Sequence, residues 1–221
     1  MSPRSGLYRV SAERAFIFAN QSHLCYKYMF GKTIQEAFME SIRRVERKLI
    51  HHGHIFDYYE DTMETEEGHR HVWDTIVHNG AAAVVPVRED GKILLVRQYR
   101  NPVERMTLEI PAGKRDSEHE STYDCIVREL EEETGYRADD ISLLLKFTSA
   151  IAYSTEVIDI YVAKGLYHTE AHPDEDEFID VVAYSTDELK QMIFDGTIMD
   201  SKTIAGVMAY IVKEGEENGK D

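Results

Sequence analysis

Three glutamates near the middle of the chain stand at helical spacing. Glu129, Glu132 and Glu133 occupy positions i, i+3 and i+4, so one side of a helix would carry all three. Carboxylates held this close repel one another, and a helix that only faced solvent would be more stable with lysines interleaved among them. The pattern therefore predicts a cation at this face. Oxygen ligands at this density suit a hard divalent ion such as Mg2+ or Mn2+ better than zinc.

The helix that would carry these glutamates has its own start and stop signals. Ser121 can accept hydrogen bonds from the first backbone amides, Asp124 stands at the third helical position, and Gly135 can end the helix. Apolar residues at i, i+3, i+4 and i+7 form a stripe for the core: Tyr123, Ile126, Val127 and Leu130. The sequence thus predicts a helix with one apolar and one acidic face.

The segment around this helix, GKRDSEHESTYDCIVRELEEETGY, resembles the signature box of the Nudix hydrolases, Gly-x5-Glu-x7-Arg-Glu-apolar-x-Glu-Glu-x-Gly-apolar. The positions that match are Gly113, Arg128, Glu129, Leu130, Glu132, Glu133, Gly135 and Tyr136. One spacing departs, because six residues rather than five separate Gly113 from Glu120. A charged exposed helix that fits by chance is the alternative, and the number of matched positions argues against it.

The composition excludes several classes of protein. The chain has 221 residues, 43% of them hydrophobic, which is enough for one domain and an added segment. A formal net charge of −16 argues against a nucleic acid or an anionic membrane as partner. Cys25 and Cys125 are too few for a disulfide framework, and no apolar run has the length of a signal core or membrane span. We expect a cytoplasmic protein that meets an anionic substrate through a metal.

The sequence pattern divides the chain into three parts. Residues 1–46 are predicted to form an N-terminal helical extension, with a helix over 34–46 that follows a capping pair. Residues 47–215 form the main domain, and 216–221 a frayed polar tail. A basic arm for nucleic acid is the less favoured interpretation of the extension, since its aromatic residues do not alternate with its charges. Met39 is an alternative start of the chain.

The main domain has the pattern of strands followed by two closing helices. The expected strands are residues 48–51, 54–63, 69–78, 81–87, 93–100, 106–110, 141–148, 157–163 and 180–184. The closing helices are capped by Ser185 and begin near Asp200. This order predicts an α/β protein with a mixed sheet covered by helices on both faces. It resembles the Nudix α/β/α sandwich, preceded here by an antiparallel ribbon and the helical extension.

Segments outside the box resemble the ADP-ribose pyrophosphatases of the Nudix family. The resemblance rests on LVRQYRNP at 95–102 and LEIPAG at 108–113. It implies that Glu129 and Glu133, with the Ala112 carbonyl, hold two or more Mg2+ ions. The catalytic face would be completed by Arg128, which orients the glutamates, and by Glu132.

Three further residues are candidates for binding the substrate. Arg100 can bridge phosphate oxygens, with a surface ion pair to a nearby glutamate as the alternative. Glu109 is expected to steady the substrate or a metal-bound water. Trp73 could stack on a nucleobase, although a packed core indole is the favoured interpretation.

Two segments after the box bear on catalysis and specificity. Where the resemblance places an acidic loop, Glu175 is the candidate general base and Glu177 a candidate metal ligand, with a solvated loop as the alternative. The turn at 149–156 lacks the proline and glycine of the family's Ser-Pro-Gly-Phe-Ser turn. The resemblance is therefore weaker at the point where the terminal ribose would be contacted.

The function implied by the resemblance is Mg2+-dependent hydrolysis of ADP-ribose to AMP and ribose 5-phosphate. The ribbon at 48–78 implies a homodimer, since it exchanges between subunits in this subfamily. Another nucleoside diphosphate derivative, such as NADH, FAD or GDP-mannose, is an alternative substrate. A module that binds ADP-ribose without cleaving it is disfavoured, because all three helix glutamates are present.

Overall fold

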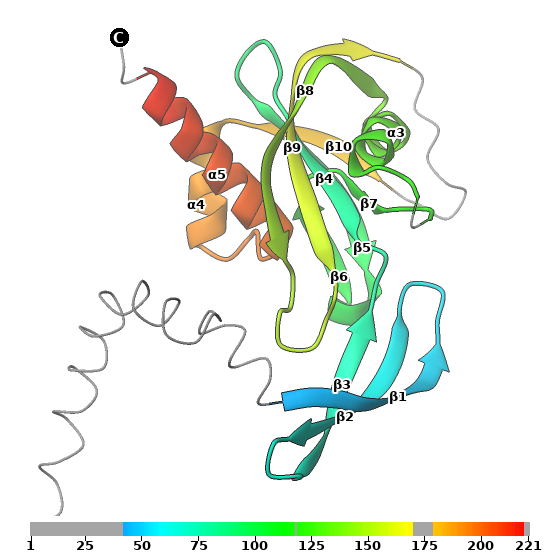
Figure 1. Ribbon diagram of the computed structural model, residues 1–221. Coiled ribbons are helices and arrows are strands. Elements are labelled where there is room, and N and C mark those ends of the chain that lie inside the picture. Colours follow the sequence, from blue (N-terminus) through cyan, green and yellow to red (C-terminus); the bar gives the residue numbers. More distant parts are fainter. Residues whose placement is uncertain (1–41, 118, 170–178, 219–221) are drawn as a thin grey trace, which may run out of the picture. The chain divides into compact units, whose positions relative to one another are not determined.

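A computed structural model of the chain describes residues 42–117, 119–169 and 179–218 (Figure 1). Its elements are β1 (Ile42–His52), β2 (Asp57–Thr65), β3 (Arg70–Val77), β4 (Ala81–Pro86), β5 (Ile93–Arg100), η1 (Asn101–Val103), β6 (Arg105–Glu109), β7 (Ala112–Lys114), α3 (Thr122–Thr134), β8 (Tyr136–Thr148), β9 (Val157–His168), β10 (Asp180–Tyr184), α4 (Thr186–Phe194) and α5 (Ser201–Asn218). None of the helices in these described ranges is both long and apolar enough to cross a membrane.

The described residues form two compact units. The ribbon unit comprises residues 42–50 and 59–74, and the main unit comprises 51–58 and the described residues from 75 onward. Strands β1, β2 and β3 pair in that order in a sheet of their own. Short reverse turns join them, so neighbouring strands run in opposite directions. This arrangement confirms the antiparallel ribbon predicted from the sequence.

The start of the ribbon corrects one prediction. The helix expected over 34–46 is wrong for residues 42–46, which belong to β1, while its earlier residues lie outside the described part of the chain. Arginines of β1 find acidic partners on β2: Arg43 lies 2.7 Å from Glu64, and Arg47 forms two hydrogen bonds of 2.6 Å with Asp61. These cross-strand pairs favour the strand over the local helical periodicity.

The main unit contains two sheets, ordered β7-β4-β9-β8 and β10-β5-β6. Strands β4 and β9 run parallel, whereas β4 with β7, β8 with β9, β5 with β6 and β5 with β10 are antiparallel. The sheet is therefore mixed, as predicted. Strands β5 and β10 also begin and end where the sequence pattern predicts them.

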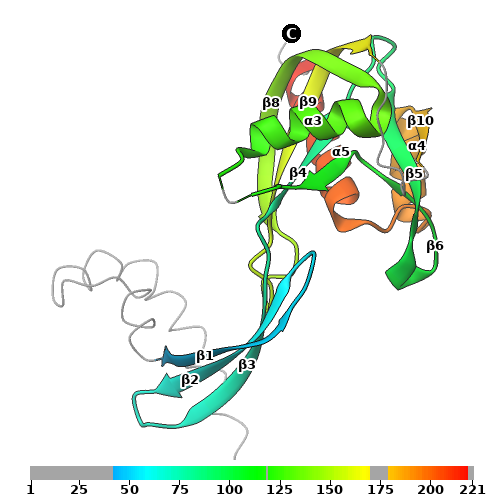
Figure 2. The same cartoon turned by 90° about the vertical axis from the view of Figure 1, so that its right-hand side faces the viewer.

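Strand β4 shows why helices cover both faces of its sheet. Ala83 and Val85 are fully buried in the core cluster that includes residues of α4 and α5, whereas Ala82 and Val84 are fully buried against residues of α3. Because successive side chains of a strand point to opposite faces, an unbroken apolar strand needs a cover on each side. Figure 2 shows α3 and α5 on opposite sides of the sheet. The α/β/α sandwich predicted from the sequence is thus confirmed.

Helix α3 has the predicted ends. The Ser121 hydroxyl accepts a hydrogen bond of 3.0 Å from the Asp124 amide, and Gly135 ends the helix with φ of 69°. The predicted apolar stripe is shifted by part of a turn. Ile126 and Leu130 are fully buried as expected, but Tyr123 is 46% exposed.

Helix α5 is mounted closely on the sheet through a glycine. A Cβ atom added at Gly206 would lie 3.0 Å from Cδ1 of Ile110 and 3.2 Å from Cγ2 of Ile160. The helix also runs further than expected. The frayed tail predicted for 216–221 is wrong for 216–218, which are helical, while 219–221 lie outside the described residues. Glutamate is a good helix former, so a helix anchored by packing extends through Glu216 and Glu217.

Candidate active site

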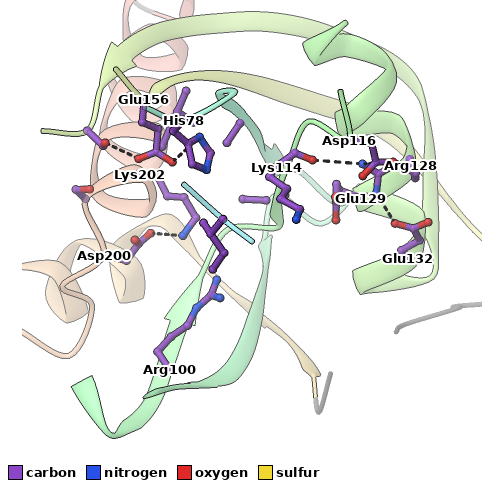
Figure 3. Close-up of a pocket in the computed structure, with 17 residues that line it drawn as sticks. His78, Arg100, Lys114, Asp116, Arg128, Glu129, Glu132, Glu156, Asp200 and Lys202 are labelled. Carbon is purple, nitrogen blue, oxygen red and sulfur yellow. Dashed lines mark hydrogen bonds and ion pairs between the residues drawn. The ribbon is translucent and has the colours of Figure 1, made fainter. Parts of the chain in front are cut away.

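A polar cavity of about 660 Å3 opens in the main unit (Figure 3). Five residues singled out in the sequence line it: Arg100, Ala112, Arg128, Glu129 and Glu132. They come from β5, β7 and α3, so the fold brings together residues that lie far apart in the chain. Two other predicted residues, Glu109 and Glu133, are buried and do not line the cavity.

On one side of the cavity, a single arginine is surrounded by carboxylates. We call this the Arg128 cluster; its acidic members are Asp116, Glu120, Glu129 and Glu132. The Nη1 atom of Arg128 lies 2.8 Å from both Glu129 and Glu132, and Nη2 lies 3.5 Å from Glu120 and 3.7 Å from Asp116. Burial alone would lower the pKa of Arg128, but these carboxylates raise it, so the guanidinium stays charged. Arg128 thus hydrogen-bonds two of the box glutamates, and the orienting role expected for it stays a prediction.

The glycine that opens the box makes room for one of these carboxylates. A Cβ atom added at Gly113 would lie 1.8 Å from Oε1 of Glu129, closer than any real contact. The neighbouring Ala112 amide donates a hydrogen bond of 3.0 Å to Oε2 of Glu133. Two glutamates of α3 thus contact the short strand β7. The box residues form a single structural unit rather than a helix with a separate loop.

Glu120 closes the loop that holds the one-residue insertion. Its Oε2 accepts a hydrogen bond of 2.6 Å from the Asp116 amide, and its carbonyl accepts one of 2.6 Å from Nε of Arg115. The insertion therefore leaves Glu120 beside Arg128, within the Arg128 cluster.

The opposite side of the cavity has a second ion-pair cluster, which we call the Glu109 cluster; it consists of Glu109, Arg100, Lys202 and Asp200. Glu109 is only 3% exposed and accepts two hydrogen bonds of 2.8 Å from Nε and Nη2 of Arg100. Nζ of Lys202 donates to Glu109 and lies 3.0 Å from Asp200. Burial would raise the pKa of Glu109, but Arg100 and Lys202 lower it to about 2, so this carboxylate is ionised at neutral pH.

This geometry modifies the prediction for Arg100 and adds one residue that was not predicted. The alternative given for Arg100, an ion pair with a nearby glutamate, is present, but its partner Glu109 is buried and Arg100 still lines the cavity. Lys202 was missed by the sequence analysis. The signal that was available is local: a lysine in the first turn of a helix opposes the helix dipole, and such conflicts often mark functional positions.

A third group on the cavity wall comes from the turn that departs from the family pattern. The Ser149 hydroxyl donates a hydrogen bond of 2.5 Å to Glu156, whose other carboxylate oxygen lies 3.6 Å from Nδ1 of His78. The Gly80 amide donates to the same Nδ1 atom at 3.0 Å. Because Nδ1 accepts, the neutral ring carries its proton on Nε2. All three side chains, those of His78, Ser149 and Glu156, line the cavity, and the sequence analysis did not predict His78 or Glu156 as site residues.

Comparison with known proteins identifies the family. The model of the NUDIX domain matches residues 77–205, which include the box and most of the residues that line the cavity. The chain belongs to the Nudix family.

Relatives of this Nudix protein carry more than one name. It is 36% identical to the methanol dehydrogenase activator of Bacillus methanolicus, over 83% of this chain and 97% of the relative. It is 32% identical to the ADP-ribose pyrophosphatase of Bacillus subtilis (strain 168), over 78% of this chain and 94% of the relative. A crystal structure of an ADP compounds hydrolase matches the fold with a TM-score of 0.71 and 24% identity, covering 81% of this chain and 96% of that one. The family resemblance stated from the sequence is confirmed.

The donor set of this Nudix box fits a hard divalent cation by its chemistry, because the carboxylates of Glu129 and Glu132 face one polar cavity. Within the described ranges, however, no group of three or more His, Cys, Asp or Glu side chains is arranged to hold a metal ion. Arg128 explains the difference, since its hydrogen bonds hold Glu129 and Glu132. In this structure the oxygens of Glu129 and Glu132 therefore converge on Arg128.

Three predicted site residues are not among the described residues that line this cavity. Trp73 lies in the ribbon unit and is 52% exposed, so the favoured interpretation of a packed core indole is wrong. Glu175 and Glu177 lie outside the described residues. Their roles as general base and metal ligand stay predictions.

Proposed function

We propose that this Nudix protein is a Mg2+-dependent pyrophosphatase that hydrolyses ADP-ribose to AMP and ribose 5-phosphate. The observation that carries the proposal is the placement of box carboxylates and a guanidinium on one cavity: Glu129 and Glu132 on one side, Arg100 on the other. A diphosphate needs both a bound cation and hydrogen-bond donors for its oxygens. The Bacillus subtilis relative that bears the name ADP-ribose pyrophosphatase supports this choice of substrate.

The metal would be held by Glu129 and Glu133 together with the Ala112 carbonyl, and Mn2+ could replace Mg2+. When bound, the ion would supply positive charge to the diphosphate and lower the pKa of a coordinated water. Arg128 keeps the box carboxylates extended toward the cavity, and Glu132 shares its guanidinium with Glu129. In this proposal Glu175 takes the proton from the attacking water and Glu177 completes the metal site.

The proposal extends to the two ends of the substrate. Arg100 binds phosphate oxygens with the N–H groups that do not face Glu109. The Glu156 carboxylate can accept hydrogen bonds from hydroxyls of the second sugar, and Nε2 of His78 can donate one to them. Trp73, half exposed on β3, is available to stack on the nucleobase. The same proposal includes a homodimer formed through the ribbon, and a reducing compartment such as the cytoplasm, which a chain with two cysteines favours.

A substrate panel tests the proposal. ADP-ribose, NADH, FAD, GDP-mannose and diadenosine polyphosphates would be incubated with and without Mg2+, and the products separated by chromatography. We expect release of AMP from ADP-ribose, only with metal, at the highest kcat/KM of the panel. A higher kcat/KM for another compound would leave a Nudix pyrophosphatase of different specificity. Tight binding of ADP-ribose without any product would instead indicate a binding module.

A further inference from the structure

Lys202 places a positive charge on the cavity wall and does not belong to the Nudix box. It is the second residue of α5, its side chain is only 13% exposed, and it lines the same cavity as Arg100 and Glu129. Figure 3 shows Lys202 and Arg100 on the side of the cavity opposite Glu129 and Arg128. The position is unusual because a positive charge in the first turn of a helix is disfavoured by the helix dipole.

The first turn of α5 is fixed firmly enough to hold this lysine in place. The Asp200 carboxylate accepts hydrogen bonds from the amide of Thr203 at 2.9 Å and from its hydroxyl at 2.6 Å. The Thr203 hydroxyl oxygen accepts in turn from the Ile110 amide at 2.9 Å, and Thr203 is fully buried. The helix start is thus tied to the connection that leads from β6 into β7. Lys202 has a defined position relative to Ala112 and Arg100.

The buried glutamate does not need the lysine to satisfy its oxygens. Glu109 already accepts two hydrogen bonds from Arg100 and one of 2.8 Å from the Thr107 hydroxyl. An ammonium group has three N–H donors. Two of those on Lys202 face Glu109 and Asp200, and no contact with the other described residues accounts for the third. An apolar side chain would fill the same space without opposing the helix dipole, so stability alone does not explain a lysine here.

We propose that Lys202 is a second anion-binding residue of the cavity, which with Arg100 holds a phosphate oxygen of the nucleoside diphosphate, and that Glu109 positions both cations. The inference rests on the proposed function, since it names the residue that receives part of the diphosphate of that substrate. Glu109 is a positioning residue because it is buried, does not line the cavity and contacts both cations. Arg100 and Lys202 come from β5 and α5, so they would reach the diphosphate from two elements.

The test compares Lys202→Met, which keeps the length of the side chain but removes its charge, with Lys202→Arg, which keeps the charge. Lys146→Met is the matched control. Lys146 also pairs with a buried carboxylate, Asp159, at 3.1 Å, but it does not line the cavity. Turnover of ADP-ribose with Mg2+ gives kcat and KM, and calorimetry gives the Kd of ADP in the same buffer. Thermal melting of each variant shows that it is folded, and Lys202→Gln replaces Lys202→Met if the latter does not fold.

We expect Lys202→Met to raise KM for ADP-ribose and Kd for ADP by about tenfold or more, with a smaller change in kcat. Lys202→Arg should stay within about threefold of the wild type and Lys146→Met within about twofold, because charge at the cavity is what binds the phosphate. Values for Lys202→Met within about twofold of the wild type would overturn the inference and leave the proposed function standing. Equal losses in Lys202→Arg and Lys202→Met would also contradict it.

The two proposals can fail separately. A wild type that binds ADP but hydrolyses no compound of the panel, with binding weakened about tenfold in Lys202→Met, would remove the proposed function and support the role of Lys202. A wild type that neither binds ADP nor hydrolyses any compound of the panel would overturn both.

Discussion

The two ion-pair clusters that face the cavity differ in their balance of charge. In the Arg128 cluster one guanidinium meets four carboxylates, which leaves a formal charge of −3. In the Glu109 cluster Arg100 and Lys202 balance Glu109 and Asp200, which leaves a formal charge of zero. The first cluster has an excess of negative charge and should gain stability from a bound cation, whereas the second is already neutral and offers N–H donors of Arg100 and Lys202. This difference is consistent with the proposal that a cation binds beside the Arg128 cluster and the substrate diphosphate beside the Glu109 cluster.

The largest effect is expected when a carboxylate is removed from the Arg128 cluster, which has the excess negative charge. Glu129→Gln should lower kcat by about 10²–10³-fold, as expected when a group that organises charge in the transition state is lost. It should also reduce the rise in Tm that Mg2+ produces in the wild type. Enzyme assays and melting curves with and without Mg2+ measure both effects.

Glu131→Gln is the control for that variant, since Glu131 lies on the same helix, pairs with Arg137 at 2.7 Å and does not line the cavity. It should keep the activity and the response to Mg2+ of the wild type. Full activity in Glu129→Gln would show that the Arg128 cluster is not the metal site.

The Glu109 cluster should make the free energy of unfolding depend on pH. The pKa of Glu109 is about 2 in the folded protein, below its ordinary value of 4.5. Its contribution is therefore complete above about pH 4.5 and is lost as the pH falls toward 2. The size of the shift corresponds to about 3 kcal/mol. Urea unfolding of the wild type and of Glu109→Gln should give free energies whose difference shrinks between pH 5 and pH 2.5, and parallel curves would contradict the prediction.

Gly113→Ala should sharpen the comparison by disturbing only the Arg128 cluster. The added methyl group meets the flexible end of the Glu129 side chain, so the cost in stability should stay within about 1 kcal/mol. The carboxylate must move, however, and kcat/KM should fall about tenfold. Urea titration and steady-state kinetics give the two numbers. A variant with normal kinetics would show that the position of Glu129 is not critical.

The smallest effects come from a matched pair of glycines in α5. A methyl group at Gly206 would crowd Ile110 and Ile160, so Gly206→Ala should lose about 1–2 kcal/mol of stability. Among the described residues, nothing outside its own stretch of helix lies within 4 Å of a methyl group at Gly215, and Gly215→Ala should gain about 0.5–1 kcal/mol through helix propensity. Urea unfolding measures both. Gly206→Ala should also raise KM, because a displaced α5 moves Lys202, while the rise in Tm with Mg2+ should stay as in the wild type. Equal free energies of unfolding for the two variants would refute the close packing of α5.

Local signals in the sequence predicted the elements around the box well. The Ser121 cap and Gly135 bound α3 as expected, because capping and a left-handed glycine act through neighbouring residues. The fully apolar segment of β4 predicted burial on both faces, and the sandwich follows from it. The approach of Arg128 to the box carboxylates was also predictable, since three of its four carboxylate partners lie within the box helix or at its start.

Contacts between distant segments were not predictable from periodicity. Lys202 and Glu109 are separated by 93 positions, and no pattern in either segment indicates that a helix start lies beside that strand end. The helix expected over 34–46 failed in 42–46 for a similar reason, because the partners that favour a strand there, such as Asp61, stand on the next strand. Glu156 reaches the cavity through a turn that lacks the family pattern, so its position is known only from the structure.

The tie between Thr203 and Ile110 has a consequence for synthesis of the protein on the ribosome. The residues that line the cavity extend from Ile55 to Lys202, and the Ile110 amide finds its side-chain partner only when the first turn of α5 arrives. Domains generally fold as units during translation, and a nascent chain without α5 lacks Val207 and Tyr210 of the core. Its cavity gains Lys202 and Asp200 only after α5 has emerged. The wall that carries Lys202 therefore depends on residues made after the box, and the cavity is complete only when both ends of the tie are present.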